Sequence, residues 1–339
     1  MKKIDIYNHF FPKAYADKMM EINPDLPDIG KRVRSIPMLF DLDERFRAMD
    51  LFGDEYSQIL TIPMPPPEAL AGPDQSPDLV RAGNDGLAEL CQKYPDRFKG
   101  FGAKMPLNNM DATLEEANRA IKDLGACGIE IGTNSNGKSM DSKEFEPLYA
   151  LMEEHDLPIW IHPCRTAEMT DYLTEDRSKY EIWWVFGWPY ETSAFMARMV
   201  FSGILDRYPN LKLITHHMGG MAPYFAGRIS PGWDVLGART TDEDYTHILG
   251  ELKKTPLEYF KENFYADTAV FGAVGATICG LDFFGDDKVV FASDSPFDPE
   301  GGTMFIRETI KILDELEVSE ETRAKIYYKN AEKLLKLNS

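Results

Sequence analysis

The sequence has no apolar stretch near the roughly 18 residues that a membrane-spanning helix needs. Its first residues carry two lysines but no apolar segment ending in a small-residue cleavage site, so we expect neither a membrane anchor nor a secretory signal. Basic residues are also scarce: 37 Lys and Arg stand against 56 Asp and Glu, a net charge of −19. Because such a chain repels phosphate backbones, we do not expect nucleic-acid binding.

Cysteine is scarce too, and no CxxC pair occurs among Cys91, Cys127, Cys164 and Cys279. Four scattered cysteines favour reduced thiols in a cytoplasmic protein. The first predicted strand is not followed by a GxGxxG motif, which argues against a dinucleotide-binding fold. What remains for chemistry is a small set of six histidines.

Short apolar runs alternate with longer amphipathic stretches through all 339 residues. Eight runs are predicted to be strands: Lys3–His9, Tyr56–Met64, Phe98–Met105, Gly125–Thr133, Leu157–Pro163, Leu211–Gly219, Phe264–Val270 and Val289–Pro296. Helical patterns separate them, as at Pro77–Tyr94 and Thr192–Tyr208. Eight strand–helix units predict an α/β fold, a (β/α)8 TIM barrel forming one domain over 1–339.

Two connections are longer than the others. They cover residues 10–40 and 164–191, after the first and fifth strands, so both are expected at the C-terminal mouth, where barrel active sites lie. The second contains an aromatic group: Trp183, Trp184, Phe186, Trp188 and Tyr190. These aromatic residues either line a pocket or form a subunit contact, so a homodimer is one expectation.

The first and fifth predicted strands end in a histidine. Side chains alternate along a strand, so Asp5, Tyr7 and His9 are expected to share the face that points into the barrel, with Ile4 and Ile6 facing the helices. In the fifth strand, Trp160 and His162 share a face. Alone, a histidine at a strand end is more often a hydrogen-bonded structural residue than a ligand.

The sixth and eighth strands add further polar ends. His216 and His217 are neighbours that point to opposite faces, so we expect only one, His217, to reach the centre, and His216 to face away. The eighth strand closes with Asp294, whose burial costs several kcal/mol unless it is paired, ligated or protonated. Because all these strand ends meet at one mouth, the imidazoles and the carboxylate are predicted to hold a divalent cation.

At this point a family resemblance is apparent. The segments IDIYNHF, IWIHP, RYPNLKLITHHMGG, FYADTAV and VVFASDSPF resemble the amidohydrolase superfamily. They are closest to its branch of metal-dependent decarboxylases, which includes aminocarboxymuconate-semialdehyde decarboxylase and the resorcylate-type enzymes. The resemblance implies that His9, His162 and Asp294 are metal ligands. It also implies that His217 lies beside the metal and touches substrate or a bound water.

One position departs from the family pattern. The family usually has His or Glu two residues before His9, whereas this chain has Tyr7. Three hypotheses follow: Tyr7 hydrogen-bonds a metal-bound water or the substrate, it ligates the metal as a phenolate, or the site has lost its metal.

The resemblance implies non-oxidative decarboxylation of a small aromatic or conjugated carboxylic acid, with Asp294, or His217 through water, supplying a proton. The substrate carboxylate needs a cation, for which Arg34 and Arg165 are candidates, although both also suit surface ion pairs; Trp160 is a candidate for stacking on a planar ring. Zn and Mn both suit such a site, and zinc is our first expectation. The alternatives are a metal-dependent hydrolase or hydratase of a lactone or unsaturated acid, and a metal-free protein without activity.

Overall fold

The structure, a computed structural model, describes residues 1–26, 28–241 and 243–337. The predicted domain, 1–339, also includes residues 27, 242 and 338–339, which lie outside the described residues. Within the described ranges, no helix combines the length and the apolar character required to cross a bilayer.

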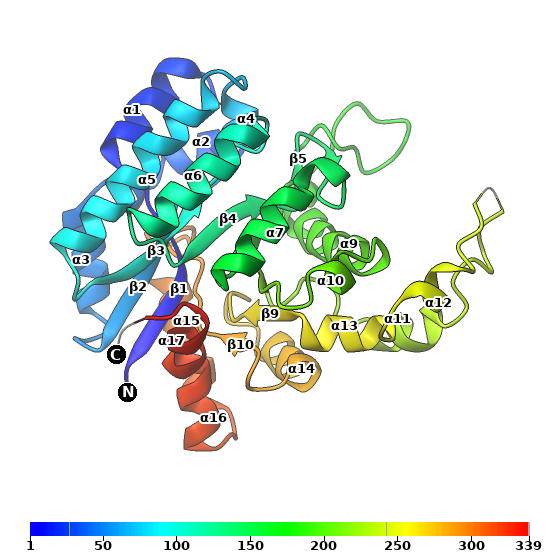
Figure 1. Cartoon of the computed structure of the whole chain (residues 1–339). Helices are drawn as coiled ribbons and strands as arrows, with labels where there is room; N and C mark the ends of the chain where they lie inside the picture. The colour runs from blue at the N-terminus through cyan, green and yellow to red at the C-terminus, as the bar shows by residue number, and fades with distance from the viewer. Residues whose placement is uncertain (27, 242, 338–339) are drawn as a thin grey trace.

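Eight parallel strands form one sheet whose order follows the chain (Figure 1). A parallel bridge between Asn8 and Ser295 brings the segment after the last strand beside the first, and the Ile6 amide donates to the Phe291 carbonyl at 3.0 Å. The predicted (β/α)8 barrel is therefore confirmed. The strands are β1 (Lys3–His9), β2 (Tyr56–Thr61), β3 (Phe98–Lys104), β4 (Gly128–Gly132), β7 (Ile159–His162), β8 (Leu213–Thr215), β9 (Phe264–Asp267) and β10 (Val289–Val290).

Helices surround the sheet in the order that the alternating pattern predicts. The predicted helix Thr192–Tyr208 forms as two pieces, because Gly203 adopts a φ of 72° and interrupts it. The helices are α1 (Lys13–Ile22), α2 (Ile29–Arg34), α3 (Leu42–Asp50), α4 (Pro67–Leu70), α5 (Ser76–Lys93), α6 (Met110–Lys122), α7 (Glu146–His155), α8 (Ile182–Val185), α9 (Gly187–Phe201), α10 (Ile204–Arg207), α11 (Ala226–Trp233), α12 (Ile248–Glu251), α13 (Pro256–Glu262), α14 (Val274–Phe284), α15 (Met304–Glu315), α16 (Glu320–Ala324) and α17 (Asn330–Leu334).

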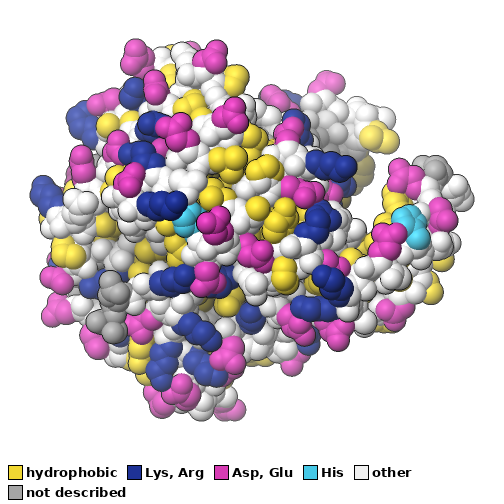
Figure 2. Space-filling view, viewed as in Figure 1, with side chains coloured by type: hydrophobic (Ala, Val, Ile, Leu, Met, Phe, Trp, Pro, Cys, Tyr) yellow, Lys and Arg dark blue, Asp and Glu magenta, His cyan; other side chains and the backbone are white. Residues whose placement is uncertain are grey.

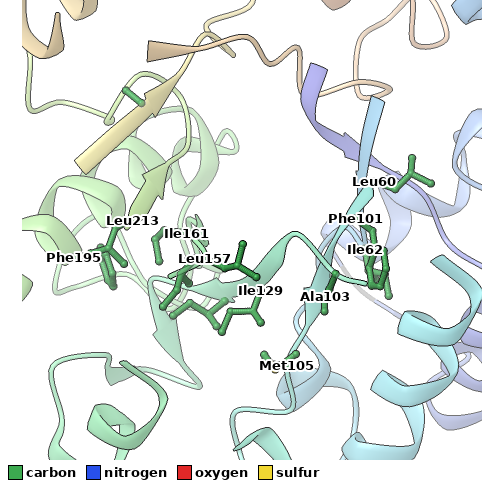
Figure 3. Close-up of a cluster of buried hydrophobic side chains, with 14 of the residues drawn as sticks. Leu60, Ile62, Phe101, Ala103, Met105, Ile129, Leu157, Ile161, Phe195 and Leu213 are labelled. Atoms are coloured by element: carbon green, nitrogen blue, oxygen red, sulfur yellow. The ribbon is translucent and has the colours of Figure 1, made fainter. Parts of the chain in front are cut away.

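Alternate strand residues enter two different hydrophobic clusters. Ile161 and Leu213 pack in the larger cluster between strands and helices, part of which Figure 3 shows. Their neighbours Trp160 and Ile214 pack in the smaller cluster, which therefore fills the barrel interior. This interior layer is a packed floor beneath the mouth.

The prediction for the faces of β1 is partly wrong. Ile4 and Ile6 pack in the interior cluster, whereas Asp5 accepts hydrogen bonds from the Tyr56 hydroxyl at 2.7 Å and the Ser293 amide at 3.0 Å. The cause is an irregularity in the pairing of β1 with β2 between Asp5 and Asn8, which reverses the alternation along the strand.

Charge is distributed without a large patch of one sign on the face shown in Figure 2, where acidic and basic side chains are interspersed. Many are ion-paired on the surface, as Arg207 is with Glu146 at 2.9 Å. The net charge of −19 is therefore spread rather than concentrated on this face.

Candidate metal centre

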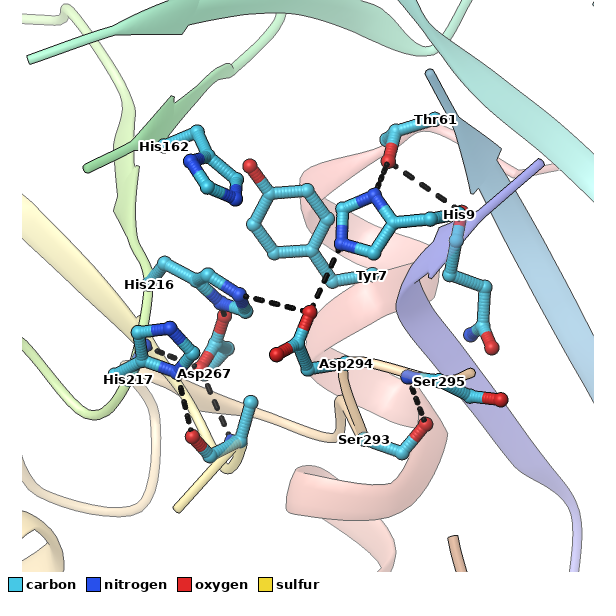
Figure 4. Close-up of polar contacts among 12 residues, drawn as sticks. Tyr7, His9, Thr61, His162, His216, His217, Asp267, Ser293, Asp294 and Ser295 are labelled. Carbon is cyan, nitrogen blue, oxygen red and sulfur yellow. Dashed lines mark hydrogen bonds and ion pairs between the residues drawn. The ribbon is translucent and has the colours of Figure 1, made fainter. Parts of the chain in front are cut away.

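Three histidines and one aspartate meet at the C-terminal ends of the strands (Figure 4). His9 ends β1, His162 ends β7, His216 follows β8 and Asp294 lies beyond β10. One potential ligand atom from each histidine lies within 4.8 Å of the others. Asp294 Oδ1 is 2.9 Å from His9 Nε2 and 3.4 Å from His216 Nε2. Of the predicted ligands, the structure thus brings together His9, His162 and Asp294.

His9 is held through one ring nitrogen and through its backbone carbonyl. Its Nδ1 lies 3.0 Å from the Thr61 hydroxyl, and its backbone carbonyl accepts a hydrogen bond from the Arg45 guanidinium. Arg45 is fully buried and also donates to Gln58 Oε1 at 2.7 Å. These contacts fix the direction of the His9 Nε2 atom, which faces Asp294.

His162 is neutral and presents one nitrogen to the centre. Its Nδ1 donates to the Pro163 carbonyl at 2.8 Å, which leaves Nε2 with a free lone pair. Burial, followed by the nearby rings of His216 and His9, holds the pKa of His162 well below its usual value. A neutral imidazole with a free nitrogen is the form that binds metals.

The expectation that His216 faces away is wrong. Its side chain is fully buried at the centre and stacks on His217 with ring centroids 3.7 Å apart. His216 lies two residues after Ile214 and shares its interior face, whereas Leu213 packs on the helix side, so the alternation was predicted in the wrong phase. His217 and Met218 then have φ values of 55° and 56° and turn the chain sharply, which brings His217 to the mouth as well. Both neighbouring histidines therefore reach the mouth.

His216 is paired with carboxylates on both ring nitrogens. Nδ1 forms a short contact with Asp267 Oδ2, and Nε2 faces Asp294. Burial alone would lower the pKa of His216, but Asp267 and Asp294 outweigh it and raise the pKa to about 10. Conversely, burial would raise the pKa of Asp294, but His216 and His9 hold it well below its usual value, so Asp294 is a carboxylate here.

His217 lies beside this cluster and is partly accessible. Its Nδ1 donates to the Ala269 carbonyl at 2.8 Å, which orients the ring. Burial, and then the neighbouring His216, lower the pKa of His217 to about 4, so its ring is neutral near pH 7. A potential ligand atom of His217 also lies within 4.8 Å of those of His216 and Asp294.

Tyr7 packs within the cluster, but its hydroxyl points to another partner. It donates to Glu130 Oε1 at 3.1 Å, and the same oxygen is 3.2 Å from Lys104 Nζ. Burial, then the charge of Glu130, raise the pKa of Tyr7 well above its usual value. A neutral phenol committed to Glu130 argues against the phenolate-ligand hypothesis.

Of the residues predicted to bind substrate, some lie near the histidine cluster and others lie away from it or are inaccessible. Arg34 points away, because its guanidinium donates to the carbonyls of Pro24 and Leu26. Trp160 is fully buried in the barrel floor and donates to the Ile6 carbonyl, so a substrate ring has no access to it. These two placements do not fit the roles that the sequence suggested.

Arg165 and the aromatic loop lie closer to the centre. Arg165 pairs with Glu191 at 3.2 Å, while its buried Nε has no hydrogen-bond partner. The Trp188 indole donates to the Arg165 carbonyl at 3.1 Å, and its ring lies 5.2 Å from that of His162. Trp188 is thus the member of the predicted aromatic group that borders the histidines.

Sequence reasoning missed several residues around the site: Arg45, Lys104, Glu130, His216 and Asp267. A signal existed for Asp267, because β9 closes with a carboxylate after an apolar run, the same pattern that drew attention to Asp294. No comparable signal marked Arg45 or Glu130, whose importance depends on contacts between distant strands.

The donor set fits a divalent cation. It combines the imidazoles of His9 and His162, the buried Asp294 carboxylate, and the buried His216 Nε2, which lies 3.4 Å from Asp294 Oδ1. Such mixed nitrogen and oxygen sites suit Zn²⁺ and Mn²⁺. All these groups lie at the mouth of the barrel, where a bound cation would face the substrate side.

Comparison with known proteins agrees with this geometry. The amidohydrolase family model matches residues 4–337. A gamma-resorcylate decarboxylase from Polaromonas sp. strain JS666 is 31% identical, with 99% of each chain covered. A solved dihydroxybenzoic acid decarboxylase from Polaromonas sp. JS666, with bound manganese and the inhibitor 2-nitroresorcinol, is 28% identical with a TM-score of 0.79, covering 100% of this chain and 98% of that one.

A second solved structure of an aromatic acid decarboxylase is also similar over nearly the whole chain. The 5-carboxyvanillate decarboxylase from Novosphingobium aromaticivorans, complexed with manganese and 4-hydroxy-3-methoxy-5-nitrobenzoic acid, is 25% identical with a TM-score of 0.82, covering 99% of this chain and 96% of that one. The resemblance of the sequence motifs is thereby confirmed over nearly the whole chain. The chain belongs to the amidohydrolase family, in the branch that contains these decarboxylases.

Proposed function

We propose that this protein is a metal-dependent carboxy-lyase that removes CO₂ from a small aromatic or conjugated carboxylic acid without oxidation. The observation that carries the proposal is that His9 lies close to both His162 and Asp294 at one mouth of a barrel whose relatives are aromatic acid decarboxylases. A hydrolase or hydratase would use the same residues, but the named relatives support the decarboxylase.

The proposed metal ligands are His9, His162 and Asp294. When bound there, a divalent cation supplies a Lewis acid and a template for a carboxylate or phenolic oxygen of the substrate. Zinc was the first expectation from the sequence, whereas the two related structures described above contain manganese. Metal analysis of the purified protein, followed by reconstitution with each ion, decides between them.

The protein residues supply a proton and shape the site. The proton delivered to the ring carbon bearing the carboxylate comes from Asp294, which rests as a carboxylate and must first take the proton up from the substrate or solvent, or from a water molecule held by His217. The new C–H bond forms first; the bond to the carboxylate carbon then breaks, its electron pair restores the aromatic ring, and CO₂ leaves. Such a donor must lie within about 3 Å of its target, directly or through one water.

The substrate carboxylate and ring need their own contacts. Arg165 is the remaining arginine candidate, since its buried Nε is unpartnered and its carbonyl is tied to Trp188. Trp188 borders His162 and offers a face or edge to a planar ring. Tyr7 and the other proposed site residues exclude water around the reacting carbon.

The test is product analysis with defined acids. Metal-loaded protein is incubated with 2,6-dihydroxybenzoate and with 5-carboxyvanillate, and CO₂ release and the ring product are measured. Release of CO₂ with one equivalent of the decarboxylated ring supports the proposal. A new carboxylate formed from a lactone or unsaturated acid, without gas, would support the hydrolase or hydratase instead.

Two further expectations stay predictions. A homodimer rests on the exposed aromatic side chains of the loop, such as Phe186 and Tyr190. A cytoplasmic location rests on cysteines that are all unpaired in the structure. Size-exclusion chromatography with light scattering tests the first, and fractionation of the source cells tests the second.

A further inference from the structure

Residue 7 contributes no ligand in this chain as the structure has it. The family resemblance implies His or Glu at this position, yet the chain has Tyr7, and its hydroxyl is bound to Glu130 rather than to the histidine cluster. Glu130 is in turn held by Lys104, so this arrangement is anchored on β3 and β4. The centre therefore has one donor fewer from β1 than the family pattern implies.

His216 lies where the missing donor would act. Its ring packs against Tyr7 with centroids 4.1 Å apart, and its potential ligand atom lies within 4.8 Å of those of His9 and His162. Its Nε2 is fully buried and has no hydrogen bond, with Asp294 Oδ1 as an ion-pair neighbour at 3.4 Å. At 3.4 Å this contact with Asp294 is long, so the buried Nε2 and the carboxylate are placed where a cation between them would satisfy both.

Asp267 fixes His216 in the orientation that a ligand needs. It contacts Nδ1, which leaves Nε2 as the nitrogen that faces the centre. Asp267 is itself held, because its Oδ1 accepts from the amides of His217 at 3.0 Å and Ala269 at 3.1 Å. A carboxylate on the far nitrogen of a metal-binding histidine is the usual way in which proteins orient such a ligand.

We propose that His216 is a ligand of the metal in this chain, that it replaces the donor which Tyr7 does not provide, and that Asp267 is its positioning residue. The exchange keeps the number of donors unchanged but moves one of them from β1 to the end of β8. The adjacent His217 is not part of this exchange, because its ligand atom is grouped with those of His216 and Asp294 and not with those of His9 and His162, and its ring stands on the accessible side.

This inference rests on the proposed function only for its premise that the site holds a metal, so its test does not use activity. The protein is stripped of metal, and Mn²⁺ and Zn²⁺ affinities are measured by competition with a chromophoric chelator. Co²⁺ is added separately, because its absorption spectrum responds to the number and kind of ligands. The variants are His216→Ala and Asp267→Asn, with His247→Ala, an exposed histidine directly before α12, as the control.

We expect Asp267→Asn to weaken metal binding by about 10-fold to 100-fold, as loss of an orienting partner does, and His216→Ala to weaken it at least as much. Both are expected to change the Co²⁺ spectrum, whereas His247→Ala is expected to keep the affinity and the spectrum of the unsubstituted protein. A second variant, Tyr7→His combined with His216→Ala, is expected to recover affinity, because a histidine at residue 7 restores the β1 donor.

The inference would be overturned if a folded His216→Ala protein bound the metal as tightly as the unsubstituted protein and gave the same Co²⁺ spectrum. Failure of the natural chain to bind any of the three ions would overturn it as well. If His216→Ala does not fold, His216→Gln is measured in the same way, and natural affinity there counts against the inference. A chain that binds metal through His216 but releases no CO₂ from any aromatic acid would remove the proposed function and leave this inference standing.

Discussion

The Asp294 carboxylate lies 2.9 Å from the His9 imidazole, although 285 positions of sequence separate the two residues. His9 ends the first strand and Asp294 follows the last, so this contact forms where the barrel closes on itself. The proposed chemistry depends on that closure, because it brings a proton carrier and a metal ligand to one point.

The first prediction concerns Asp294→Asn. The amide keeps the shape of the side chain but removes both the charge and the transferable proton, so turnover is expected to fall by about 100-fold or more, the usual contribution of general acid–base catalysis. The melting temperature is expected to fall as well, because the variant loses a proposed metal ligand and the buried partner of His9 and His216. Steady-state CO₂ release measures the first effect and calorimetry the second. Near-natural turnover would exclude Asp294 as the proton carrier, and Asp287→Asn, an exposed carboxylate before β10, is the control.

Metal removal gives the second prediction. Dialysis against a chelator, followed by removal of the chelator, is expected to abolish turnover and to lower the melting temperature. The physical reason is that an ion bound only by the folded chain stabilises it by about 2.7 kcal/mol at a free concentration of 100 Kd. Adding Mn²⁺ or Zn²⁺ back is expected to restore both quantities. Full turnover in demonstrably metal-free protein would favour chemistry without a metal.

The position of the site at one end of the barrel could be predicted from the sequence, because polar residues at the ends of apolar runs mark the ends of strands. Eight apolar runs predicted a barrel, and in a barrel all carboxyl ends of the strands share one mouth. From that step His9, His162 and Asp294 were expected to meet, and in the structure His9 lies within 4.8 Å of His162 and 2.9 Å from Asp294, measured between potential ligand atoms.

The details that failed depend on backbone irregularities and on distant contacts. The faces of Ile4, Asp5 and Ile6 were predicted the wrong way round, because the pairing of β1 is irregular between Asp5 and Asn8. His216 was assigned to the wrong face because β8 was read in the wrong phase: His216 follows Ile214 on the interior face, and the positive φ at His217 brings the next histidine to the mouth too. A single sequence records neither effect.

The third prediction concerns Trp160 and Trp188: substitution of the first is expected to change stability, and substitution of the second is expected to change KM. Trp160→Phe is expected to lower the free energy of unfolding by about 2 to 4 kcal/mol, because it opens a cavity in the barrel floor and leaves the Ile6 carbonyl without its donor. The KM of this variant is expected to equal that of the unsubstituted protein. Trp188→Ala, beside His162, is expected to raise KM by up to about tenfold through lost ring contact.

Denaturant titration and steady-state kinetics on both variants separate the two roles. A raised KM in Trp160→Phe with unchanged stability would return that residue to the substrate site. An unchanged KM in Trp188→Ala would place the substrate ring elsewhere in the mouth.

Arg45 supports a fourth prediction, on stability. Arg45→Met removes the donors to Gln58 Oε1 and to the His9 carbonyl, both buried, and is expected to lower the free energy of unfolding by about 2 to 4 kcal/mol. Because the same contact anchors His9, weaker metal binding is expected as well. The control is Arg47→Met, two residues along α3, whose side chain is 66% exposed and pairs with Glu44 at the surface.

Glu68 provides a fifth prediction, on pH. Its carboxylate is buried on α4, and neither oxygen makes a hydrogen bond by ordinary geometry. Burial raises its pKa to about 7, and its own backbone, Lys104 and Ser135 offset this only in part. Tyr15 and Cys164 also lie within its electrostatic reach. Since the folded chain holds this proton more tightly than the unfolded chain does, Glu68 costs stability progressively as pH rises from about 4.5 to about 7.

The matched test is Glu68→Gln, which cannot ionise. The stability of the variant relative to the natural chain is expected to rise by about 3 kcal/mol between pH 4.5 and pH 8, because the upward pKa shift is worth about 1.4 kcal/mol for each pH unit. Other buried groups, such as Asp5, titrate in both proteins and cancel in the difference. Urea titrations of both proteins at several pH values measure it, with Glu89→Gln on the exposed face of α5 as the control. A difference that stays constant across this range would show that Glu68 has a solvated or paired carboxylate in the folded protein.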